Sequence, residues 1–190
     1  MNNKTLAVTI IFAALTVALA LTGVGVPAPY APFLIYNLWE IPIVTAFILA
    51  GPISGLAIAF LNAGVLFVFD PGALPTGPLY NLLAVMSTLL GVYVANRFFK
   101  SKTGNGKPIL KIATAATVLG VTLRVIVMTL VNYITLRYPY PIGFGMSEIA
   151  IIGFTPLGAL FNGTLALYTI PIGEFISNLV KDRLKVATLK

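Results

Sequence analysis

The longest stretches without a charged side chain limit what this chain can fold into. A helix needs about 20 mainly apolar residues to cross the hydrocarbon core of a bilayer. Four windows contain no Asp, Glu, Lys or Arg, and they hold 35, 29, 26 and 25 residues: Thr5–Trp39, Ile41–Phe69, Pro71–Asn96 and Ile149–Gly173. Each window is long enough to span a membrane, so the sequence predicts a multi-pass protein of the cell membrane.

The overall composition agrees with this prediction. Hydrophobic residues make up 58% of the 190 residues and charged residues only 9%, whereas soluble domains contain about 25% charged residues. So little charge cannot cover a surface that faces water, but it suits a surface that faces lipid. The length suits one domain, and we expect residues 1–190 to form a single transmembrane domain.

The missing residue types argue against an enzyme. The chain has no cysteine and no histidine, which removes disulfides, thiol nucleophiles, the usual general base and the commonest metal ligand. The five carboxylates are scattered, and no phosphate-binding glycine motif is present. We therefore expect no catalytic residues, no metal site and no cofactor.

Six helices account for the apolar windows. The window from Ile41 to Phe69 would be about 43 Å long as one helix, which exceeds a hydrocarbon core of about 30 Å. Gly51-Pro52 inside it is a helix-breaking pair. The predicted fold is an all-α bundle of six transmembrane helices, with Pro156 and Pro171 as expected kinks: Thr5–Leu21, Ile35–Ala50, Ile53–Phe69, Leu79–Phe98, Ile109–Leu136 and Glu148–Val180.

The basic residues predict the orientation. One cluster lies between Arg97 and Lys111, and a second lies between Lys181 and Lys190. Both flank apolar spans, as the positive-inside rule expects, which favours membrane orientation over nucleic-acid binding. Six spans place both termini and ten of the twelve basic residues on the cytoplasmic side; five spans would place nine there, so helix length and the break decide for six.

The expected outer loops are apolar, aromatic and rich in proline, unlike ordinary solvent loops. Rigid aromatic loops at one end of a bundle predict a lid over a ligand cavity, because aromatic rings stack on flat ligands. The alternative is an aromatic belt at the membrane surface. The candidate contacts are Tyr30, Phe33 and Tyr36 in the loop Gly23–Tyr36, with Trp39 as a further ring to stack on a ligand.

Polar side chains at the depth of the spans are candidate ligand contacts. Amides both donate and accept hydrogen bonds, so they suit a neutral ligand with carbonyls, ring nitrogens or hydroxyls. The alternative is hydrogen bonding between helices, worth about 0.6 kcal/mol on average. The four candidates are Asn62, Asn81, Asn132 and Asn162.

Arg124 is predicted to lie in the middle of a span. A central charge costs at least about 3 kcal/mol by insertion scales, so it needs a partner. Glu40 and Glu148 are the weak candidates near the outer helix ends. The sequence leaves open whether Arg124 forms a structural ion pair or contacts an anionic ligand.

Two patterns of small residues allow helices to approach closely: Ala14-x-x-x-Ala18 and Gly51-x-x-x-Gly55. They predict packing either within this chain or against a partner membrane protein.

The ordered set of these features resembles the substrate-binding (S) subunits of energy-coupling-factor vitamin transporters, and most closely the riboflavin-specific type. The likeness runs over most of the chain. It includes the loop Pro27-Ala-Pro-Tyr-Ala-Pro-Phe, the segment Pro75-Thr-Gly-Pro-Leu-Tyr-Asn-Leu-Leu-Ala84, the pair Asn132-Tyr133 and the pair Asn162-Gly163.

The resemblance implies a six-helix bundle that binds a vitamin beneath its first loop. It also implies a membrane coupling subunit driven by two ATPase subunits, with Ala14 and Ala18 facing the coupling subunit and Asn132 facing the flavin. The chain differs from the type where it has Asn162 in place of a usual lysine and Leu61-Asn62 in place of a usual lysine-asparagine pair.

The sequence is compatible with three main functions, and a self-sufficient channel is a weaker fourth because the sequence shows no ring of charges and no filter-like segment. The first is a vitamin-uptake subunit that binds riboflavin or a related flavin between the last three helices. The second is another water-soluble vitamin, such as thiamine or a pyridoxine-like compound, on the same scaffold. The third is a membrane assembly or structural protein without a small-molecule site.

Overall fold

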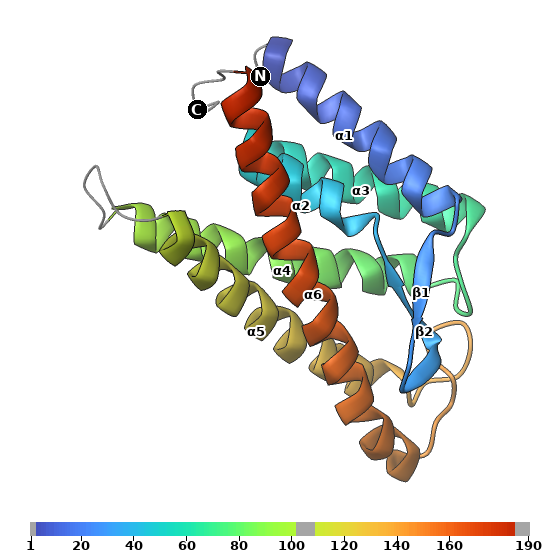
Figure 1. The fold of residues 1–190 in the computed structure, drawn as a ribbon. Coiled ribbons are helices and arrows are strands. Elements are labelled where there is room, and N and C mark those ends of the chain that lie inside the picture. Colours follow the sequence, from blue (N-terminus) through green and yellow to red (C-terminus); the bar gives the residue numbers. More distant parts are fainter. Residues whose placement is uncertain (1–2, 102–108, 185–190) are drawn as a thin grey trace.

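A computed structural model describes residues 3–101 and 109–184 as a bundle of helices with one small hairpin (Figure 1). The predicted polar linker Lys100–Lys107 lies largely outside the described residues, as does the last part of the C-terminal basic cluster. The elements in chain order are α1 Asn3–Leu21, β1 Gly25–Ala28, β2 Ala31–Asn37, α2 Glu40–Ala50, α3 Pro52–Phe69, α4 Gly77–Ser101, α5 Ile109–Thr135 and α6 Glu148–Leu184.

Within the described residues, five helices are long and apolar enough to cross a membrane: α1, α3, α4, α5 and α6. The remaining helix, α2, has 11 residues. At 1.5 Å per residue such a helix is only about 16 Å long, so α2 is too short to cross a bilayer by itself. The predicted membrane bundle is confirmed as a mostly helical fold. The structure shows five candidate membrane spans among the described residues and does not show the predicted sixth.

The prediction of an all-α chain is wrong in the segment after α1. Residues Gly25–Ala28 pair antiparallel with Ala31–Asn37, in a register that places Gly25 opposite Asn37. The predicted helix from Ile35 therefore begins only at Glu40. Prolines fix φ and lack a backbone donor, so they disfavour a helix but are tolerated in the edge strands of a two-stranded sheet.

The predicted break at Gly51-Pro52 is confirmed. Gly51 has φ of 101°, and it ends α2 and begins α3. Glycine adopts this backbone conformation without steric cost, and proline is favoured at the first helical position. Gly55 then lies against Phe47 of α2, so the small-residue pattern at this break packs two helices of the same chain.

The last helix is longer than predicted. It runs through both Pro156 and Pro171 without interruption and reaches Leu184 rather than Val180. Its N-terminal half lies beside α5, and its C-terminal half crosses α2, where Gly173 approaches Val44 (Figure 1).

The core sits where α2 crosses α4 and α6. Ile43, Leu89 and Ile170 are almost completely buried there. Many large apolar side chains on the outer faces of the helices are instead exposed, such as Ile10, Phe60 and Ile149. Exposed apolar surface of this extent suits lipid contact and does not suit water.

The hairpin and two loops gather at one end of the bundle. The α3–α4 loop and the α5–α6 loop lie there with β1 and β2, whereas the first turn of α1 and the last turn of α6 lie at the other end (Figure 1). The hairpin and these two loops line a cavity at this end of the bundle.

Candidate ligand-binding cavity

A cavity of about 370 Å³ lies between the hairpin, the α3–α4 loop and the ends of α4, α5 and α6. This volume falls in the range of small-molecule sites, roughly 300–1,000 Å³. Its polar lining residues include Glu40, Asn81, Arg124, Asn132 and Asn162, and its aromatic lining residues are Phe33, Trp39, Tyr80, Phe144, Phe154 and Phe161.

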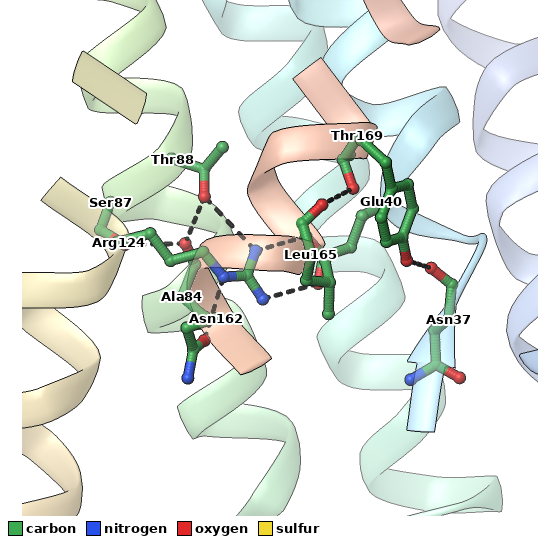
Figure 2. Close-up of polar contacts among 10 residues, drawn as sticks. Asn37, Glu40, Ala84, Ser87, Thr88, Arg124, Asn162, Leu165 and Thr169 are labelled. Atoms are coloured by element: carbon green, nitrogen blue, oxygen red, sulfur yellow. Dashed lines mark hydrogen bonds and ion pairs between the residues drawn. The ribbon is translucent and has the colours of Figure 1, made fainter. Parts of the chain in front are cut away.

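Arg124 lies on the cavity wall and is almost completely buried. Its Nη1 lies 2.5 Å from Oε2 of Glu40, and its Nη2 donates to Oε1 of Glu40 at 2.9 Å (Figure 2). Its Nε donates to Oδ1 of Asn162 at 3.0 Å, and Nη1 also reaches Oγ1 of Thr88 at 3.4 Å. One guanidinium of α5 thus joins α2, α4 and α6.

This arrangement decides between the two interpretations of Arg124. The side chain forms a buried two-pronged ion pair with Glu40, one of the two weak candidates, whereas Glu148 accepts a hydrogen bond from Tyr133 instead. Because both charges are satisfied within the protein, the wall of the cavity carries an ion pair and not a free cation.

The structure brings three of the four predicted amides together. Asn81, Asn132 and Asn162 all line the cavity. The nitrogen of Asn132 comes close to Gly158, where a Cβ would lie 3.2 Å from it. The absence of a side chain at Gly158 therefore leaves room for the Asn132 amide against α6.

The fourth amide, Asn62, does not line this cavity. It is buried in α3 beside a much smaller gap that it shares with Trp39 and Asn81. Its Oδ1 has no hydrogen-bond partner among the described residues. Trp39 and Asn81 thus separate the Asn62 oxygen from the main cavity.

The aromatic side chains of the hairpin and Trp39, which caps the start of α2, divide into two kinds. Phe33 and Trp39 line the cavity, and the Phe33 ring lies 6.2 Å from that of Phe154. Tyr30 and Tyr36 do not line it; their hydroxyl groups lie 2.6 Å apart. Burial and this hydrogen bond raise the pKa of Tyr30 to about 12, so this phenol stays neutral at physiological pH.

Tyr36 attaches the hairpin to α6. Its ring stacks on Phe161 with centroids 5.1 Å apart, and it meets Tyr168 edge-on. The hydroxyl of Tyr168 donates to the carbonyl oxygen of Asn37 at 2.6 Å. Tyr36 of the hairpin and Tyr168 of α6 thus hold the hairpin against α6.

Two hydroxyl groups, those of Thr76 and Tyr80, donate hydrogen bonds to the α5–α6 loop. Thr76 donates to the carbonyl of Pro141 at 2.8 Å, and Tyr80 donates to the carbonyl of Ile142 at 2.6 Å. The α3–α4 loop is thereby fastened to the α5–α6 loop.

Sequence reasoning missed several lining residues on α6. The lining residues of this helix are Phe154, Gly158, Phe161, Asn162 and Leu165, and their spacings of three and four residues place them on one face of a helix. Steps of four residues backwards from Asn162 identify Gly158 and Phe154, and one such step backwards from Leu165 identifies Phe161.

The predicted partner-binding alanines lie elsewhere. Ala14 and Ala18 are exposed on α1, on the face that the bundle does not cover. The buried face of α1 carries Thr9, Phe12 and Thr16 instead.

Comparison with known proteins supports the resemblance to transporter S subunits that the sequence indicates. No family model matches the chain. The chain is 25% identical over 173 residues to the riboflavin transporter RibU of Staphylococcus aureus (strain TCH60), covering 87% of each protein. A solved structure, the S component of a bacterial ECF transporter, has a TM-score of 0.64 at 22% identity and covers 97% of both chains.

The fold is that of the solved S component, and the sequence likeness extends over most of the chain. Together with the five apolar helices, these likenesses make the chain a multi-pass protein of the cell membrane. The expected resemblance is confirmed: the chain is similar to the S components of energy-coupling-factor transporters and, in sequence, to the riboflavin type.

Proposed function

We propose that this chain is the substrate-binding subunit of an energy-coupling-factor vitamin transporter and that it binds riboflavin or a related flavin from the outside. The observation that carries the proposal is the cavity of about 370 Å³ under the hairpin, lined by four asparagines (Asn37, Asn81, Asn132 and Asn162) and several aromatic rings. Amides that both donate and accept suit the carbonyls and ring nitrogens of a flavin, and the aromatic rings suit its flat face.

The charges of the cavity favour an uncharged ligand. Among the described lining residues, Glu40 and Arg124 are the charged pair, and each neutralises the other. A cationic vitamin such as thiamine would have to compete with Arg124 for the Glu40 carboxylate, which is costly in a buried site. The flavin is therefore preferred, and an uncharged pyridoxine-like compound is the second choice.

The cavity also favours a binding function over a purely structural one. A membrane assembly protein has no need of a cavity lined by four asparagines. In the proposed function the chain performs no chemistry, and the bound flavin is the transported substrate and not a cofactor.

Transport requires partners, since binding alone moves nothing across the membrane. A ligand shifts a conformational equilibrium only by its differential affinity for the two states. We propose that a membrane coupling subunit and two ATPase subunits supply that difference. The exposed Ala14 and Ala18 of α1 are the proposed contact with the coupling subunit.

The proposed topology has both termini in the cytoplasm, six membrane segments and residues 1–190 as one transmembrane domain. The chain has no native cysteine, so a single introduced cysteine is the one site on the chain that a maleimide can label. A maleimide that cannot cross the membrane should label Tyr140→Cys on intact cells and Lys4→Cys only after permeabilisation. Labelling of both on intact cells would contradict the topology.

The absorbance spectrum of the freshly purified protein in mild detergent tests the ligand. Co-purified flavin gives visible yellow absorbance that denaturation releases. If the protein is colourless, riboflavin is added and its fluorescence is followed. A chain that neither carries nor binds a flavin, alone or with its partner subunits, would refute the proposal, and mass spectrometry of the extracted ligand would then identify the class of compound bound.

A further inference from the structure

The two polar atoms of the Asn162 side chain have different partners. Its Oδ1 accepts a hydrogen bond from Nε of Arg124 at 3.0 Å, and its Nδ2 donates to the carbonyl oxygen of Gly158 at 2.9 Å (Figure 2). Asn162 lines the cavity, although only 5% of its surface is exposed. Its orientation therefore decides which polar group it offers to a ligand.

The hydrogen bond from Arg124 fixes the orientation of the Asn162 amide. The oxygen and nitrogen of an amide are nearly indistinguishable by shape, so their assignment rests on the hydrogen bonds that they make. A guanidinium has only donors, and the atom that faces Nε of Arg124 must be the oxygen. The nitrogen then points away from Arg124. Among the described residues it has one acceptor, Gly158, so its second N–H remains for another partner.

Arg124 is itself held too firmly to turn. Glu40 accepts from both terminal nitrogens of the guanidinium. Oγ1 of Thr88 accepts from Nη1 and donates to the carbonyl of Ala84 at 2.9 Å. A planar group that is bonded in this two-pronged way has one geometry available to its Nε.

We propose that Arg124 is a positioning residue that determines which ligands the cavity prefers: it turns the Asn162 amide so that an N–H, and not the carbonyl oxygen, is offered to the ligand. The proposal rests on the proposed function and adds a requirement to it. A favoured ligand turns a hydrogen-bond acceptor, a carbonyl oxygen or a ring nitrogen, towards α6. A ligand that offers a donor there meets a second donor.

Riboflavin analogues that differ in one acceptor test this requirement. The 2-thio and 4-thio analogues replace a carbonyl oxygen by sulfur, which accepts weakly, and the 5-deaza analogue replaces a ring nitrogen by CH. We expect wild-type protein to bind one of these analogues about tenfold more weakly than riboflavin, as the loss of one buried hydrogen bond predicts.

Two variants then separate positioning from stability. Asn162→Asp removes the donor at nearly constant shape, and Arg124→Lys keeps a positive charge for Glu40 but loses the planar contact with Asn162. We expect the preference for riboflavin over the weak analogue to fall from about tenfold to about onefold in both. The matched control Arg137→Lys, on an exposed arginine two residues beyond the end of α5, should keep the wild-type ratio.

A purely structural role would weaken binding of riboflavin and of every analogue by the same factor and leave the ratio unchanged. The proposal is overturned if Arg124→Lys keeps the wild-type ratio, or if wild-type protein binds all four flavins equally.

The failure of the proposed function gives a different result, since wild-type protein would then bind no flavin. In that case, or if Arg124→Lys does not fold, the orientation is read from ligand-free protein labelled with ¹⁵N-asparagine. The side-chain amide signal of Asn162 must then shift in Glu40→Gln, which loosens Arg124, and must stay in place in Arg137→Lys; an Asn162 signal that does not move in Glu40→Gln overturns the proposal.

Discussion

Two neighbouring turns of α5 make different kinds of contact with α4 and α6, and the second turn also contacts α2. At Gly120 the contact is purely steric: a Cβ on Gly91 of α4 would lie 2.5 Å from the Gly120 backbone, and Ile170 of α6 fills the other side. At Arg124, one turn later, the contact is a network of directional polar bonds with Glu40, Thr88 and Asn162. The same face of one helix thus changes from close packing to polar bonding where the cavity begins.

The difference shows how a polar site can exist inside a membrane protein. The backbone contact at Gly120 brings α4 and α5 close enough for Thr88 to reach Arg124. The buried charges of Arg124 and Glu40 are then tolerated because the two side chains pair with each other. We infer that close packing beneath the cavity sets the geometry and that the polar layer above it sets the ligand preference. Substitutions in the steric contact at Gly120 and in the polar network at Arg124 separate these two contributions.

Removal of the arginine should have the largest effect. Arg124→Met leaves Glu40 buried without its partner, and the loss of one member of a buried pair costs about 3–5 kcal/mol. Thermal unfolding in detergent, followed by the fluorescence of Trp39, should show a large fall in stability. Combination with Glu40→Leu should recover most of it, since an apolar pair of similar volume avoids the unpaired charge. A loss below about 1 kcal/mol for the single change would contradict the buried pairing.

The steric contact should be nearly as sensitive to a single methyl group. Gly91→Ala places a Cβ against the backbone of α5, and such overpacking costs about 1–3 kcal/mol. The control is Gly64→Ala in α3, where a Cβ meets nothing within 4 Å and alanine favours the helix by up to about 1 kcal/mol. Equal melting temperatures for the two variants would show that α4 and α5 are not in backbone contact.

The amides should divide according to the cavity that each one faces. We expect Asn132→Ala to weaken flavin binding about tenfold, because one buried hydrogen bond to the ligand is lost. Asn62→Leu should leave binding unchanged and should raise stability by about 1 kcal/mol, because it removes a buried oxygen that has no partner. Weakened flavin binding in Asn62→Leu would place the ligand deeper than the cavity suggests.

The smallest expected effect concerns the lid. Tyr168→Phe removes the hydrogen bond from the Tyr168 hydroxyl to the Asn37 carbonyl, which is worth about 1 kcal/mol. The hairpin should open more often, so the flavin should dissociate several-fold faster in a stopped-flow experiment. An unchanged dissociation rate would show that the Tyr36–Phe161 stack holds the hairpin by itself.

Much of the helical architecture could be predicted because apolar windows and helix breakers are local features. Gly51-Pro52 ended one helix and began the next as expected, and the starts and ends of α1, α3 and α5 fell close to their predicted positions. The hairpin was missed because a segment with three prolines, Pro27, Pro29 and Pro32, reads as irregular. Its strand pairing depends on residues that lie up to 12 positions apart, Gly25 and Asn37.

The candidate site was less predictable for the same reason. Composition and depth drew attention to Asn132, Asn162 and Arg124, and the structure places all three on the cavity wall. The partner of Arg124 is Glu40, 84 residues away in the sequence, and no local pattern distinguishes it from Glu148. The sequence also does not show that the hydroxyl groups of Tyr30 and Tyr36 form a hydrogen bond with each other. Nor does it show that Phe33 lines the cavity.

A titration of ligand-free protein with riboflavin tests whether this cavity is the flavin site, with flavin fluorescence as the readout and Phe161→Ala as the comparison. We expect saturable quenching at one flavin per chain, because the proposed site places the ring system against aromatic side chains. It also predicts much weaker binding in Phe161→Ala, which removes both a cavity wall and the platform under Tyr36. No quenching, or quenching that Phe161→Ala leaves unchanged, would contradict the assignment of this cavity as the flavin site.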